Sequence, residues 1–128
     1  MASGEEGEPP ITCDYLVVGA GIAGLSFVDT ILSENTTATL IIVDRNSRPG
    51  GHWTKAYPFV RLHQPSCFYG VNSVPLGERS FDIRDRATGR EVLEYCERVR
   101  DAFVATGRVT FFFDAEYRFD EKIGRAHV

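Results

Sequence analysis

The sequence contains few cysteines and no arrangement of them that suggests a cross-link. Only three occur in 128 residues, and Cys13, Cys67 and Cys96 are far apart with no C-x-x-C pair. An odd number at such spacing argues against both a disulfide framework and a zinc site. We therefore expect a reducing compartment, the cytoplasm, and no metal centre.

Basic runs and long apolar runs are also missing. Lys and Arg total 14 against 18 Asp and Glu, so the formal net charge is -4. Without a basic run to neutralise phosphates, nucleic acid is not an expected partner. The opening, MASGEEGEPP, is acidic and rich in Pro and Gly, which predicts a flexible tail over residues 1–12 and no membrane segment. These exclusions favour a small molecule as the partner and leave the oligomeric state open.

Two short apolar runs with a helical pattern between them indicate a βαβ unit. Residues 15–18 and 40–43 are apolar, as strands are when both faces of a parallel sheet are covered. Between them, apolar residues recur at helical spacing and form one stripe that faces the sheet. The members of that stripe are Ile22, Leu25, Val28, Ile31 and Leu32.

Later residues predict a second helix and a third strand. Thr88 and Glu91 have capping-box spacing, and Gly107 suits a C-terminal turn, so a helix is expected over 89–106. A strand should follow over 109–113. Residues 45–86 lack a clear period and are expected to be irregular with one short helix. The pattern predicts an α/β fold with a central parallel sheet.

The turn between the first strand and the first helix reads GAGIAG, which is G-x-G-x-x-G over residues 19–24. Asp44 ends the next strand 20 positions after Gly24, where dinucleotide-binding domains place a ribose-binding acid. Gly19 should permit a tight turn, Gly21 should let a pyrophosphate approach the backbone, and Gly24 should let the helix pack on the strand. The Asp44 carboxylate should accept hydrogen bonds from ribose hydroxyls and repel a 2'-phosphate. This context predicts a Rossmann-like domain.

The loop after Asp44, DRNSRPGGHW, carries a second glycine pair and a tryptophan. With the first motif, it resembles the FAD-binding domain of flavin-containing monooxygenases and their Baeyer-Villiger relatives. The resemblance covers about residues 13–120 and is most specific through Trp53. The next stretch, YPFVRLHQPSCFYGVNSVPLG, is similar to the segment that reaches the flavin ring in those families. The resemblance implies the N-terminal part of an FAD-binding Rossmann-like domain.

Three parts of the chain would then contact FAD. The glycine motif would bind the pyrophosphate, Asp44 the adenosine ribose, and residues 51–53 would continue the contact toward the flavin. The implied cofactor-binding residues are Gly19, Ala20, Gly21, Ile22, Ala23, Gly24, Asp44, Arg45, Gly51, His52, Trp53, Leu62 and Gln64. Many family members have Asn near the flavin where this chain has Gln64, which is the one candidate for catalysis. Trp53 has an equally weighted alternative as a core aromatic.

In such a family, the full protein would reduce FAD with NADPH and pass one atom of O2 to an amine or sulfide, or insert it beside a ketone. The second G-x-G-x-x-G, which would open the nicotinamide-cofactor domain, does not occur in these 128 residues, so the chain alone is not expected to be active. Two alternatives remain open. One is an FAD-dependent reductase or amine oxidase-type flavoprotein with the same βαβ unit, and the other is a standalone dinucleotide-binding module without turnover.

The last residues, KIGRAHV, have no apolar period, and no strand is expected there. The peptide from Ile123 to Val128 can be encoded by ATC GGA AGA GCA CAC GTC, which matches the beginning of a widely used sequencing adapter. The next triplet of that adapter is a stop codon. The hypothesis is therefore that residues 122–128 are a non-native tail, and that residues 13–121 are a truncated, incomplete domain.

Overall fold

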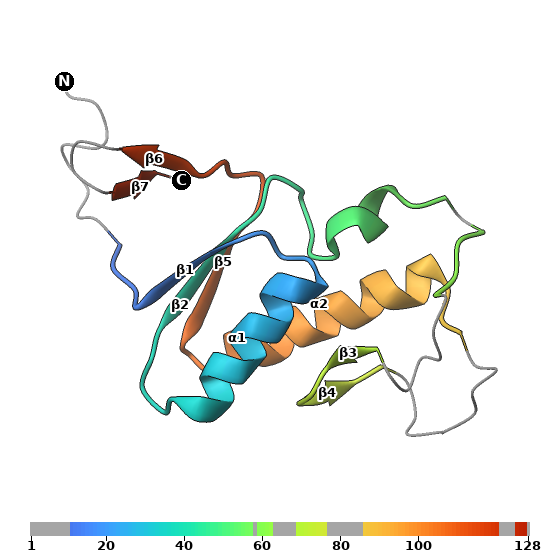
Figure 1. Ribbon diagram of the computed structural model, residues 1–128, viewed down its shortest axis with the longest axis horizontal. Coiled ribbons are helices and arrows are strands. Elements are labelled where there is room, and N and C mark those ends of the chain that lie inside the picture. Colours follow the sequence, from blue (N-terminus) through green and yellow to red (C-terminus); the bar gives the residue numbers. More distant parts are fainter. Residues whose placement is uncertain (1–10, 58, 63–68, 77–85, 121–124, 128) are drawn as a thin grey trace.

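The computed structural model of the protein describes residues 11–57, 59–62, 69–76, 86–120 and 125–127. Its centre is a parallel sheet with the strand order β1-β2-β5. The strands are Tyr15–Val18 (β1), Leu40–Val43 (β2) and Val109–Phe112 (β5), and both long helices pack beside the sheet (Figure 1). The expected α/β architecture with a central parallel sheet is confirmed.

Burial differs between the strands because of their places in the sheet. All four residues of β2 are buried, since β1 and β5 pair with it on either side and side chains cover both faces. Its composition, Leu-Ile-Ile-Val, suits that position because branched apolar side chains pack well on a pleated surface. In β1, which lies at an edge, Tyr15 and Val18 are exposed.

The first helix, α1 (Ile22–Glu34), packs its apolar stripe against the core through the fully buried Leu25 and Val28. Arg108, which precedes β5, binds the carbonyl groups at the end of this helix. Its guanidinium donates to the Leu32 oxygen at 3.3 Å, to the Ala38 oxygen at 2.9 Å, and also to the Asn35 oxygen. A cation at a helix C-terminus satisfies carbonyls that the helix leaves unpaired and complements its dipole.

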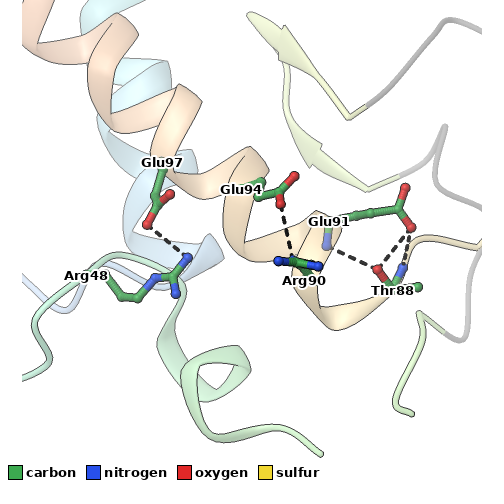
Figure 2. A network of polar contacts seen from close by, with 6 residues as sticks. All are labelled: Arg48, Thr88, Arg90, Glu91, Glu94 and Glu97. Atoms are coloured by element: carbon green, nitrogen blue, oxygen red, sulfur yellow. Dashed lines mark hydrogen bonds and ion pairs between the residues drawn. The ribbon is translucent and has the colours of Figure 1, made fainter. Parts of the chain in front are cut away.

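The second helix, α2 (Gly89–Ala105), begins with the expected capping box. The Thr88 hydroxyl accepts from the Glu91 N–H at 3.1 Å, and a Glu91 carboxylate oxygen accepts from the Thr88 N–H at 3.0 Å (Figure 2). The bonds from the Thr88 backbone and hydroxyl hold the pKa of Glu91 below its usual value. The inward face of α2 supplies Tyr95, Val99 and other fully buried residues to the core.

The chain segment that connects β2 to α2 contains one short helix, as expected, and a hairpin that the sequence did not indicate. The short 3-10 helix η2 spans Gly51–Lys55, and the hairpin pairs β3 (Gly70–Val71) with β4 (Val74–Pro75). The Tyr95 hydroxyl accepts from the Val71 N–H at 2.7 Å and donates to the Val74 oxygen. This α2 side chain therefore attaches the hairpin to the core.

The final described segment corrects one expectation. Residues Arg118–Asp120 (β6) and Arg125–His127 (β7) form an antiparallel pair, so the expectation of no strand near the end was wrong. Backbone pairing requires no apolar period in a short two-stranded ribbon, so the polar sequence did not exclude it. The origin of residues 122–128 and the domain boundaries stay predictions.

Candidate dinucleotide-binding site

A cavity of about 720 Å³ lies at the edge of the sheet where the parallel strands end. Its walls include Val18 and Gly19 after β1, Asp44 and Arg45 after β2, and Tyr117 after β5. Ligands of open α/β sheets bind in the crevice outside the carboxyl ends of the strands. The cavity therefore occupies the position expected for a nucleotide.

The first glycine loop has the geometry that the motif predicts. Gly19 turns the chain with φ of +106°, a conformation that L side chains rarely adopt, and its N–H donates to the Val43 oxygen at 2.7 Å. A Cβ placed on Gly24 would lie 2.2 Å from the Gly19 carbonyl oxygen. Gly24 is therefore what allows α1 to approach the turn so closely, and the expected roles of Gly19 in the turn and Gly24 in packing are confirmed.

The second glycine pair packs directly on the first loop. The Gly50 N–H donates to the Ala20 oxygen at 2.9 Å. A Cβ placed on Gly51 would lie 3.0 Å from the Gly21 Cα, so the two backbones are in contact. Because neither glycine carries a side chain, the start of α1 is bordered by bare backbone from both loops. Such a surface suits close approach by a phosphate group.

The start of α1 presents N–H groups that the helix does not use. Its first i to i−4 bond runs from the Leu25 N–H to the Gly21 oxygen at 3.0 Å, so the preceding N–H groups lie outside the helical ladder. Within the residues that the structure describes, no side chain caps this end and its first turn holds no acid. The start of α2, by contrast, has both a cap and an acid. Of these two helix starts, only that of α1 resembles an anion site.

Asp44 is mostly buried, with 8% of its surface exposed, and connects the three strand ends. One carboxylate oxygen accepts from the Ala20 N–H at 2.6 Å, and the other accepts from the Asn46 N–H at 2.7 Å. Its backbone N–H donates to the Phe112 oxygen at 3.0 Å, and its backbone oxygen accepts from the Ala115 N–H at 3.1 Å. Asp44 also belongs to the residues that line the cavity.

The loop after Asp44 is fixed to α2 by an ion pair. Arg48 lies 2.9 Å from the Glu97 carboxylate, and both side chains are partly exposed (Figure 2). Exposed pairs of this kind contribute about 0–1 kcal/mol, so the bond orients the loop more than it stabilises the fold. Burial raises the pKa of the nearby Cys96 thiol to about 11, while the positive charge of Arg48 acts in the opposite direction.

The remaining predicted contacts are spread over different environments. Arg45 lines the cavity and His52 is exposed. Trp53 is buried, and its indole N–H donates to the Tyr69 hydroxyl at 3.1 Å, so it contributes to the core. Leu62 is buried and its N–H donates to the Ala87 oxygen at 3.0 Å. Contact of these residues with a cofactor stays a prediction.

Ala20 and Gln64 complete the predicted contacts. Ala20 is fully buried, and both its N–H and its carbonyl oxygen have partners within the protein. Its direct contact with a cofactor therefore stays a prediction that these bonds do not favour. Gln64, the candidate for catalysis, lies outside the described residues.

Sequence reasoning missed part of the cavity wall, namely Asn46, Lys55 and residues 115–117. One signal could have indicated the last group. Since parallel strands end at the same edge of a sheet, the residues that follow the third predicted strand belong beside Asp44. No comparable signal marks Lys55, because its place at the cavity depends on how η2 folds.

Two kinds of site have no support within the described part of the chain. No group of three His, Cys, Asp or Glu residues there is arranged to hold a metal ion. Neither long helix nor any other helix in the same residues is long and apolar enough to cross a membrane.

Comparisons with known proteins agree with the geometry. The NAD(P)-binding Rossmann-like domain family matches residues 17–86. Uncharacterized protein Rv2000 of Mycobacterium tuberculosis is 45% identical over 118 residues, which cover 86% of this chain and 22% of that protein. Uncharacterized protein Mb2023 of Mycobacterium bovis has the same identity and coverage. The chain thus spans about a fifth of the length of the curated relatives it matches.

Solved structures with a similar fold include several monooxygenases. A flavin-containing monooxygenase from Stenotrophomonas maltophilia has a TM-score of 0.66 and 22% identity over 89% of this chain and 35% of its own. An oxidized steroid monooxygenase bound to NADP has a TM-score of 0.61 and 28% identity, covering 88% of this chain and 22% of its own. Cyclohexanone monooxygenase from Rhodococcus sp. Phi1, bound to NADP+, has a TM-score of 0.61 and 25% identity, covering 93% and 24%. With its parallel sheet, glycine turn and family match, this chain belongs to the NAD(P)-binding Rossmann-like domain family and has the fold of the corresponding part of flavin monooxygenases.

Proposed function

We propose that this chain binds the ADP part of FAD and forms the N-terminal FAD-binding part of a flavin-dependent monooxygenase-like oxidoreductase that uses NADPH. The observation that carries the proposal is the uncapped start of α1, which is bordered by glycine backbone and follows a turn whose Gly19 lines the same cavity as Asp44. The steroid and cyclohexanone monooxygenases with a similar fold support the oxidoreductase class.

The residues present fit such a cofactor. A Cβ on Gly19 would meet no described atom within 4 Å, so this part of the turn is open beside the cavity. The unused N–H groups at the start of α1 and the positive end of its dipole would bind the pyrophosphate. The cavity would hold the adenosine, with the Asp44 carboxylate near the ribose and its charge opposing a 2'-phosphate. That charge is the reason to prefer FAD over NADP(H) at this site.

Bound FAD would supply the redox chemistry, accepting a hydride from NADPH and delivering electrons to O2. The described residues contribute binding and orientation: the helix start and glycine loops hold the phosphates, and the cavity holds the adenosine. The proposed substrate of the whole protein is a small molecule with a soft nucleophilic atom or a ketone. Because these residues build only the nucleotide end of a site, we expect no oxygenation by this chain alone.

The proposal is tested by cofactor binding to the purified chain. FAD should be retained through gel filtration, should show quenched flavin fluorescence on titration, and should be displaced by ADP. NADPH should bind more weakly because of its 2'-phosphate. No saturable binding of FAD or ADP by the folded chain would refute the proposal.

A charge placed at the start of α1 gives a sharper test. Ala23 is exposed in the first turn of α1, so Ala23→Glu should keep the fold. An acid near a helix start interacts favourably with the helix dipole and stabilises the helix by about 0.3–1 kcal/mol. The same carboxylate would repel a pyrophosphate, so FAD affinity should fall about tenfold, equivalent to about 1.4 kcal/mol. Ala102→Glu, on the exposed face of α2, is the matched control and should leave affinity unchanged. Equal affinity of both variants would place the phosphates elsewhere.

A further inference from the structure

Asp44 makes four hydrogen bonds to backbone groups, and they reach all three loops at the carboxyl edge of the sheet. Its carboxylate accepts from Ala20 in the loop after β1 and from Asn46 in its own loop, at 2.6 Å and 2.7 Å. Its backbone N–H donates to the oxygen of Phe112, at the end of β5, and its backbone oxygen accepts from the N–H of Ala115, in the loop after β5. No sequence motif indicates these bonds, because the G-x-G-x-x-G pattern assigns the acid to a ribose.

The bond to Ala20 has a direct consequence for the phosphate site. Ala20 stands between Gly19 and Gly21, and its carbonyl oxygen accepts from the Gly50 N–H at 2.9 Å. One buried peptide segment therefore joins Asp44 on one side to the second glycine loop on the other. If the Ala20 N–H lost its acceptor, a buried donor would be left unpaired, which proteins avoid by shifting the backbone. Such a shift would move the glycines that border the start of α1.

The loop after β5 depends on the same residue. Asp114 has φ of 53°, an uncommon conformation for a residue other than glycine, and its N–H donates to the Asn46 oxygen at 2.9 Å. The neighbouring Ala115 donates to Asp44. The Asp44 carboxylate holds Asn46 from one side while Asp114 binds Asn46 from the other. The cavity wall formed by residues 115–117 is thus connected through two short steps to the carboxylate.

We infer that Asp44 is a positioning residue: its carboxylate holds the glycine loop and the cavity wall in the arrangement that receives the nucleotide, independently of any bond to ribose. The inference deepens the proposed function and rests on it for the identity of the ligand. It makes a claim that ribose binding does not make, since removal of the carboxylate should weaken even ligands that have no ribose hydroxyls.

The experiment combines a protein change with a ligand change. Dissociation constants for ADP and for 2',3'-dideoxy-ADP are measured with the unmodified chain and with Asp44→Asn, which preserves size but replaces one acceptor by a donor. The loss of the acceptor should displace the glycine loop, and this effect should outweigh the relief of repulsion between the Asp44 charge and the diphosphate, so 2',3'-dideoxy-ADP should bind about tenfold more weakly to the variant. Unchanged affinity for 2',3'-dideoxy-ADP would overturn the inference and leave Asp44 as a ribose contact only.

Amide hydrogen exchange in the free protein supplies a readout that does not need a ligand. The N–H groups of Ala20 and Asn46 should be protected in the unmodified chain, and at least one should exchange about tenfold faster in Asp44→Asn. Amides of Val28 and Val99 in the helices should be unaffected, which separates a local change from general destabilisation. Unaltered exchange at both Ala20 and Asn46 would overturn the inference. If instead ADP failed to bind the unmodified chain, the proposed function would fail while this exchange test would still decide the role of Asp44.

Two further variants complete the design. Asp14→Asn is the matched control, because Asp14 also accepts from a backbone N–H, that of Thr39 at 2.8 Å, but at the opposite end of the sheet. It should alter neither nucleotide affinity nor exchange at Ala20 and Asn46. Asp44→Ala removes both acceptor oxygens, and should increase exchange at both amides.

Discussion

Gly24→Ala tests whether close packing of α1 on the glycine turn shapes the site. The added methyl would lie 2.2 Å from the Gly19 carbonyl oxygen, whereas real Cβ contacts stay at 3.0 Å or more, so the helix or the turn must move by about 0.8 Å. Overpacking costs about 1–3 kcal/mol, and a rigid backbone neighbour favours the upper end. Alanine returns up to about 1 kcal/mol of helix propensity. The expected net loss is about 2 kcal/mol of unfolding free energy.

For a domain of this size, that loss corresponds to a fall in Tm of about 8 °C. Thermal unfolding followed by circular dichroism measures it, and the FAD titration should show weaker binding because Gly19 and Gly21 are displaced. Ser26→Ala, in the same helix, is the control and should change stability by no more than about 0.5 kcal/mol. Stability of Gly24→Ala equal to or above that of the unmodified chain would show that the helix does not approach the turn as described.

Three further predictions concern other contacts. Arg108→Ala should lower the unfolding free energy by about 2 kcal/mol because carbonyls at the end of α1 lose a charged donor, whereas Arg108→Lys should recover part of it, as urea unfolding will show. Burial raises the pKa of Cys96 to about 11, so the stability that the protonated thiol contributes should be complete below about pH 9 and be lost as pH rises toward 11. Because Cys96 is buried and Cys13 is not, peptide-resolved alkylation at pH 8 should label Cys13 faster than Cys96. Thr88→Ala should lower the unfolding free energy by about 1 kcal/mol because α2 loses its cap. The pKa of Glu91 is lowered in the folded chain, so the stability that Glu91 contributes should be present above the ordinary carboxyl pKa and be lost as pH falls through the pKa of the folded chain. Acid unfolding of the variant and of the unmodified chain will measure this loss.

Local patterns predicted the elements well because their causes are local. The apolar residues of α1 recur at 3.6-residue spacing, the capping box of α2 needs only Thr88 and Glu91, and the turn at Gly19 requires a conformation that glycine adopts readily. Strand assignment over 40–43 followed from a short run of branched apolar residues. Each of these features involves neighbours along the chain, so a single sequence contains the required information.

Contacts between distant segments could not be read in the same way. The hairpin of β3 and β4 depends on Tyr95, which lies more than twenty residues away, and the short pair of β6 and β7 has no periodic signal. The bond from the Trp53 indole N–H to the Tyr69 hydroxyl also joins residues 16 positions apart, and contact of Trp53 with a cofactor stays a prediction. In these cases the partner is chosen by the packed arrangement and not by the identity of the residue.

Asp44 shows where the boundary lies. Its type and its distance from the glycine motif were enough to predict a βαβ nucleotide fold and an acid at the end of β2. The bonds that its carboxylate makes to Ala20 and Asn46 exist because the parallel strands bring three chain segments to one edge of the sheet. Spacing along the chain therefore determined which chemical group is present at the site, while folding selected the atoms that it binds, since hydrogen bonds depend on distances in space.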